Sequence, residues 1–108
     1  MFRRETRVAA DDETRDWVGP VLHRCPIADA VVAAIQEENP RARIVDRGAY
    51  LRVLTPERCR VTRAAIERRT GEPFRLPPDL ELIMPSFKGF LEISEDEATW
   101  RVSKGGKP

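Results

Sequence analysis

The chain has little of what metal binding and nucleophilic catalysis require. Its 108 residues include one histidine, His23, and two cysteines, Cys25 and Cys59. A zinc site needs three or four ligands, and nothing in the sequence brings Cys59 to the pair His23 and Cys25. A Cys25–His23 nucleophile is equally weak, because no evident residue orients the imidazole. We therefore expect no metal and no catalytic residue, and packing at the edge of the core explains His23 and Cys25 better.

Long apolar runs and an excess of one charge are also missing. No stretch approaches the ~18 apolar residues of a membrane span, and the N-terminus lacks the apolar region of a secretory signal. Nineteen basic residues are mixed along the chain with eighteen acidic ones, for a net charge of +1. This balance argues against nucleic acid or an anionic membrane as a partner. We expect a cytoplasmic protein whose two thiols are free.

The composition, 41% hydrophobic and 34% charged, is typical of a globular protein of one domain. Residues 1–16 depart from it, with nine charges and few apolar residues besides Phe2 and Val8. Such a segment cannot bury enough surface to offset its ordering entropy. We predict a flexible N-terminal arm over 1–16, a single domain over 17–102 and a frayed tail over 103–108. The arm either has no role or becomes ordered on a partner.

The most distinctive stretch runs from Asp79 to Ile93. Apolar residues alternate with others over 79–84, where Leu80, Leu82 and Met84 share one face, and again over 89–93, which is typical of half-buried strands. The break between them is Pro85-Ser86-Phe87-Lys88-Gly89. Proline removes a ladder donor, and glycine permits unusual torsions or close approach of another backbone. We predict a rigid hairpin with Phe87 at its bend, the ring either exposed for docking or folded into the core.

Two helices are predicted from caps and apolar spacing. The first begins at Pro26 and ends at Asn39, with an inward stripe of Ile27, Val31, Ala34 and Ile35. The second covers 63–70, with Thr62 as its N-cap, Ile66 inward and Gly71 just past its end. The loop over 72–78 should plug the core with Phe74 and Leu76.

Further strands are expected at 17–22, 42–47, 49–54, 59–61 and 98–102. Pro20 restricts the first to an edge or a bulge. Residues 55–58 could begin a helix or form a turn, and the alternation after them favours the turn. In the last strand, Ala98, Trp100 and Val102 should face inward. The order gives an α+β fold of two βαββ-like halves, with mainly antiparallel sheets packed on two principal helices.

Asp46 and Arg47, close to Tyr50, form the remaining candidate for acid–base chemistry. Arginine does not titrate in a useful range, so an ion pair or a structural role at a strand end is the better reading.

Four segments together carry a family resemblance: Val18-Gly19-Pro20-Val21-Leu22, Asp46-Arg47 with Tyr50, Gly71-Glu72-Pro73-Phe74, and Leu80 to Gly89. In this order and spacing they resemble the effector, or coupling, proteins of bacterial multicomponent diiron monooxygenases. That family includes the regulatory components of methane, phenol, toluene and alkene monooxygenases. The similarity covers about residues 17–102 and looks closer to the toluene and alkene members.

The resemblance implies a protein that binds no cofactor and is not an enzyme. It implies docking on the α-subunit of a diiron hydroxylase, in a system with a reductase or ferredoxin, where the effector tunes active-site access, oxygen activation and coupling. The matching docking residues are Pro85, Ser86, Phe87, Lys88, Gly89 and Phe90. Many relatives have small or hydroxylated residues at Pro85 and Phe87. The other pattern residues, which we expect to be structural, are Val18, Gly19, Pro20, Asp46, Arg47, Tyr50, Gly71 and Phe74.

Two other functions stay open on the residues alone. A stand-alone small-molecule sensor of the α+β kind would need a closed apolar pocket between sheet and helices. A small enzyme would use His23, Cys25 or Asp46.

Overall fold

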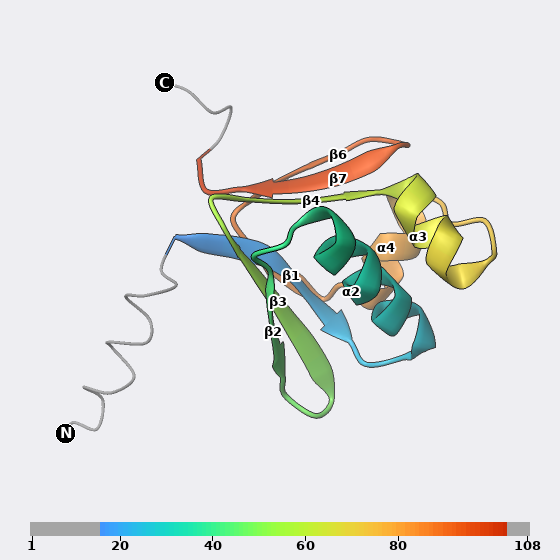
Figure 1. The fold of residues 1–108 in the computed structure, drawn as a ribbon, viewed down its shortest axis with the longest axis horizontal. Coiled ribbons are helices and arrows are strands. Elements are labelled where there is room, and N and C mark those ends of the chain that lie inside the picture. The colour runs from blue at the N-terminus through green and yellow to red at the C-terminus, as the bar shows by residue number, and fades with distance from the viewer. Residues whose placement is uncertain (1–15, 104–108) are drawn as a thin grey trace.

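A computed structural model describes residues 16–103 of the chain (Figure 1). The predicted arm over 1–16 and the tail over 103–108 therefore lie outside the described residues, apart from Asp16 and Ser103. The elements in chain order are β1 (Trp17–His23), α2 (Pro26–Glu38), β2 (Arg43–Asp46), β3 (Tyr50–Pro56), β4 (Arg58–Thr62), α3 (Arg63–Thr70), α4 (Pro78–Ile83), β5 (Ser86–Lys88), β6 (Phe90–Ile93) and β7 (Glu97–Arg101).

The strands form two antiparallel sheets, which confirms the α+β class. One sheet has the order β2-β3-β1-β5, and the other has the order β4-β7-β6. The helices gather on one side of the molecule, and α2 lies in front of the four-stranded sheet in Figure 1. The two βαββ-like halves are not separate units, because β5 from the second half completes the sheet of the first.

Helix α2 follows its predicted boundaries but is rotated slightly from the predicted stripe. Proline occupies its first turn, and Asn39 is its C-cap. The buried residues are Ala28, Val31, Val32, Ala34 and Ile35. Ile27 is 46% exposed, so its predicted burial is wrong. It lies at the edge of the stripe in the first turn, where helical side chains point beyond the start of the helix.

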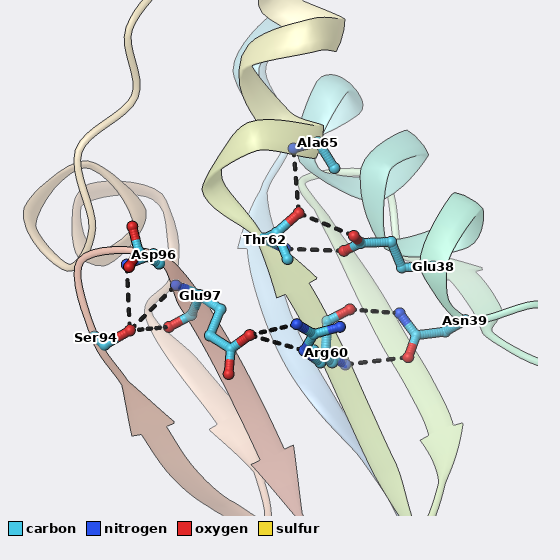
Figure 2. Close-up of polar contacts among 8 residues, drawn as sticks. All are labelled: Glu38, Asn39, Arg60, Thr62, Ala65, Ser94, Asp96 and Glu97. Carbon is cyan, nitrogen blue, oxygen red and sulfur yellow. Dashed lines mark hydrogen bonds and ion pairs between the residues drawn. The ribbon is translucent and has the colours of Figure 1, made fainter.

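Helix α3 has the predicted boundaries because both of its ends carry local signals. The Thr62 hydroxyl accepts a hydrogen bond from the Ala65 amide at 3.2 Å, and Gly71 takes the left-handed conformation with φ 74°. Figure 2 shows that the same hydroxyl donates to Glu38 Oε2 at 2.9 Å. The end of α2 is thereby joined to the start of α3.

The predicted hairpin over 79–93 is wrong. Residues 78–83 form α4, in which Leu80 is buried and Leu82 is 77% exposed. Proline sits in the first turn, where its fixed φ favours a helix, and the Asp79 carboxylate accepts from the Arg75 amide at 2.7 Å. The two strands that follow then enter different sheets, β5 beside β1 and β6 beside β7.

Gly89 lies where the chain passes from one sheet to the other. Its φ is 107°, and an added Cβ would lie 2.7 Å from Val18 Cγ1 and 2.8 Å from the Arg101 carbonyl oxygen. The predicted close approach of another backbone at Gly89 is therefore confirmed, although the reason is a crossing between sheets rather than a hairpin bend.

Strand β1 lies inside its sheet, so of the two positions predicted for Pro20, an edge or a bulge, the edge is wrong. The pairing with β3 runs from Trp17↔Pro56 to His23↔Tyr50 and is interrupted at Gly19 and Pro20, since proline has no N–H to donate. On the other side Pro20 lies opposite Phe87 of β5. A Cβ on Gly19 would lie 2.2 Å from the Val53 carbonyl oxygen, so the two backbones are too close there for any other residue.

Most of the remaining predictions hold with small shifts. Residue 57 forms the turn before β4, with φ 67°. Phe74, Leu76 and Trp100 are buried in the core. Val102 follows the end of β7 and is exposed, so its predicted inward position is wrong.

Candidate docking surface

An open groove of about 510 Å³ lies on the four-stranded sheet. Its lining follows the alternation of the strands, with Gly19, Val21 and His23 from β1, Tyr50 and Arg52 from β3, and Ser86 and Lys88 from β5. Cross-strand partners share a face of a sheet, and the pairs Val21↔Arg52 and His23↔Tyr50 place these positions together. The partners of the opposite alternation, Leu22↔Leu51, are buried in the core. We call the face that bears the groove the outer face.

Small residues explain the hollow. Gly19 has no side chain, and Ser86, opposite Val21, has a short one. The larger side chains of Tyr50 and Arg52 on β3 border this space. Phe87 lies opposite Pro20, so it has the other alternation of β5 from Ser86 and Lys88.

Phe87 is 43% exposed, so of the two predicted alternatives its ring is not folded into the core. It lies on β5, the last strand of the sheet, and not at a hairpin bend. Pro85, Ser86 and Gly89 beside it are also exposed, and Lys88 is half-buried. Phe90 is 49% exposed but belongs to β6 in the other sheet. The predicted docking segment is thus a surface segment that crosses from one sheet to the other, and its docking role stays a prediction.

Asp46 and Arg47 close the turn between β2 and β3. The Asp46 carboxylate forms an ion pair with Arg24 and accepts from the Gly48 amide at 2.8 Å. The hydrogen bond from Arg24 is the main reason that the pKa of Asp46 is lowered, followed by the one from Gly48. The Arg47 amide donates to the Tyr50 carbonyl at 2.9 Å. Through these contacts both residues stabilise the turn.

Tyr50 also lines the groove, a role that the sequence pattern did not indicate. Its side chain is exposed and lines the groove together with His23 and Arg52, which sequence reasoning also missed as surface partners. The signal available was the alternation Tyr50, Arg52 on one face of a strand, which predicts a shared face but not which strands lie beside it.

The thiols and the histidine do not form a site. Cys59 is fully buried, and burial raises the pKa of its thiol to about 11. Cys25 is half-buried after the end of β1. No group of three His, Cys, Asp or Glu residues within residues 16–103 is placed to hold a metal ion.

The remaining pattern residues lie where they shape the fold. Val18 and Phe74 are core residues. Pro20 is buried in β1, and Gly71 ends α3.

The comparison with protein families is decisive. Residues 16–101 match the model of the MmoB/DmpM family. The chain belongs to the MmoB/DmpM family. The predicted resemblance to effector proteins of multicomponent monooxygenases is therefore confirmed, and members of this family are effector or regulatory components, not enzymes.

One similar protein is the effector subunit of the alkene monooxygenase system of Xanthobacter autotrophicus. It is 38% identical over 97 residues, which cover 88% of this chain and 95% of that protein. Two chains in solved structures of a phenol hydroxylase–regulatory protein complex have the same fold as this chain. Their TM-scores are 0.71 and 0.69, at 18% and 19% sequence identity. The matches cover 79% of this chain in both cases, and 95% and 98% of those chains.

Among residues 16–103, no helix has the length and apolar character that crossing a membrane would require.

Proposed function

We propose that this effector binds the diiron hydroxylase component of a multicomponent monooxygenase and couples reductant use to hydrocarbon oxidation. The observation that carries the proposal is the 38% identity to an alkene monooxygenase effector subunit over nearly the whole length of both chains. Phenol hydroxylase bound to its regulatory protein, a structural neighbour of this chain, supports a hydroxylase as the partner. The system would include a reductase or ferredoxin and operate in the cytoplasm.

The proposed docking region is the segment 85–90 with the groove beside it. Phe87 and Phe90 each expose a large part of their rings to solvent. Aromatic residues dominate the binding energy of many interfaces, and a standard interface takes about 800 Å² from each partner. Strand pairing of β5 with β1 and of β6 with β7 fixes the backbone beneath both rings, so that backbone need not become ordered on docking.

The proposed mechanism is differential binding. A chain that supplies no catalytic residue changes turnover only by preferring one conformation of the hydroxylase, and such couplings are typically ~1–3 kcal/mol. The preferred conformation would set active-site access and the timing of oxygen activation on the α-subunit.

The test is steady-state turnover of the hydroxylase encoded beside this chain, with its reductase, as this protein is titrated in. We expect a saturable rise in product formed per reductant consumed, near one effector per active site. The absence of any rise would overturn the proposal. Tight binding of a small metabolite by the isolated protein would then favour the alternative of a small-molecule-binding regulatory domain.

A further inference from the structure

The outer face of the four-stranded sheet carries charge of one sign. The charged positions that share this face through cross-strand pairing are Arg43, Arg52 and Lys88. None of the outward positions of β1, β2, β3 and β5 is an aspartate or a glutamate. Because basic and acidic residues are nearly equal in number along the chain, this separation gives the face a positive field that the composition does not predict.

The contrast with other arginines strengthens the observation. Arg60 pairs with Glu97 at 2.6 Å, Arg75 with Asp79 at 2.9 Å and Arg101 with Glu92 at 3.0 Å. For Arg52, no carboxylate within residues 16–103 lies at ion-pair distance. Arg52 is half-buried between its strand neighbours, so its guanidinium is held near the groove.

The face also has an apolar component of its own. Leu54 shares the outward alternation with Arg52, yet it is 5% exposed and lies outside the main core cluster. Its cross-strand partner Arg43 stacks over the Trp17 ring, 4.8 Å from the ring centroid. Arginine and tryptophan at this end of the face, and Tyr50 at the other end of β3, are residue types that protein interfaces favour, whereas a solvated sheet face is normally polar with mixed charge.

We propose that the outer face binds a carboxylate-bearing segment of the hydroxylase, with Arg52 and Lys88 contacting aspartate or glutamate side chains in the groove beside Tyr50. The inference rests on the proposed function and adds the chemistry of the surface that the partner presents. Charge complementarity selects an acidic partner, and the planar guanidinium of Arg52 suits the two oxygens of a carboxylate.

The first test reverses one charge. We expect Arg52→Glu to weaken binding to the hydroxylase about tenfold at about 50 mM salt, with Arg52→Gln between it and wild type. The difference should shrink at about 300 mM salt, where screening is stronger. The matched control is Arg58→Glu, an exposed arginine at the start of β4 in the other sheet, which should change binding less than about twofold. Circular dichroism confirms that each variant is folded.

The second test identifies the occupant of the face. The lysines of the chain are Lys88, Lys104 and Lys107. A carbodiimide joins a lysine amine directly to a carboxylate in contact with it, and mass spectrometry locates the pair. We expect a cross-link from Lys88 to an aspartate or glutamate of the hydroxylase in the complex. Lys88→Arg, which keeps the charge, should remove it.

The outcomes are distinct. A cross-link from Lys88 to Asp11, Asp12 or Glu13 of the same chain, or to a second copy, would overturn the inference by naming another occupant. Equal affinities of wild type and Arg52→Glu for the hydroxylase at low salt would also overturn the inference. If the wild type still activates the hydroxylase in that case, the proposed function stands. A wild type that neither binds nor activates the hydroxylase would overturn both.

Discussion

Trp100 is the largest side chain without solvent exposure. It lies on β7 between Cys59 of β4 and Leu91 of β6, at the centre of the three-stranded sheet. We expect Trp100→Ala to lower the free energy of unfolding by ~3–5 kcal/mol, measured by urea denaturation. Trp100→Phe should cost less, because it keeps much of the ring and removes an indole N–H that has no partner among the described atoms. Equal urea midpoints for wild type and Trp100→Ala would contradict this packing.

Phe87 should behave in the opposite way, since its ring is exposed on β5. We expect Phe87→Ala to change stability by no more than about 0.5 kcal/mol, the range of most surface substitutions. If Phe87 is an anchor of the hydroxylase interface, about tenfold more effector should be needed for half-maximal activation. Leu82→Ala is the matched control, because Leu82 is more exposed and lies on α4. A loss of activation that follows the loss of melting temperature would show a structural role instead.

At the scale of elements, the end of α2 is joined by a few side chains to the end of β4 and the start of α3. Glu38 accepts from the Thr62 amide and hydroxyl, and the Asn39 side chain bonds the backbone of Arg60 at 2.6 Å and 3.1 Å (Figure 2). Thr62 thus caps one helix and holds the end of another.

We therefore expect Thr62→Ala to lower the free energy of unfolding by about 0.5–2 kcal/mol, the range for loss of an N-cap. Thr62→Ser keeps the hydroxyl that accepts from Ala65 and donates to Glu38, so it should stay close to wild type in the same thermal or urea measurement. Equal destabilisation by both substitutions would assign the effect to the lost methyl group and not to the cap.

The same elements show what sequence can and cannot predict. The limits of α3 were predictable because Thr62 and Gly71 are local signals. Residues 79–84 were not, because Leu80 and Met84 share a face in a strand as well as in a helix. Leu82 and Ile83 distinguish the two, because exposure of Leu82 and packing of Ile83 against the core fit a helix and not a strand. Exposure of Phe87 was one of two alternatives, but the groove depends on β5 pairing with β1, a long-range contact that no local pattern encodes.

At the scale of the whole molecule, the two sheets differ in how they use charge. The three-stranded sheet pairs two of its arginines with acidic neighbours, Arg60 with Glu97 and Arg101 with Glu92. The four-stranded sheet leaves a positive outer face and places its ion pair, Arg24–Asp46, at the end of the β2–β3 turn. Gly89 lies where the chain passes between the two sheets and packs closely against Val18 and Arg101. The position of the segment proposed to dock therefore depends on how the two sheets pack together.

Carboxylates that pair with arginines also link stability to pH. Asp46, Glu37 and Asp79 each have a lowered pKa, in every case mainly through a hydrogen bond from an arginine. A lowered pKa in the folded state means that the unfolded state binds more protons in acid, so stability falls as the pH drops. The contribution is complete above the ordinary carboxyl pKa of about 4 and is lost as the pH falls through the lowered values.

We therefore expect a melting temperature that is nearly constant from about pH 7 to about pH 5 and declines below about pH 4. Glu37→Gln removes the partner of both Arg68 and Arg69 on α3, so its melting temperature should be lower than wild type at neutral pH and its decline in acid shallower. Circular dichroism melts across this range make the comparison. A main loss of stability between pH 7 and 5 would place the controlling group elsewhere, because carboxylates with lowered pKa values keep their charge throughout that interval.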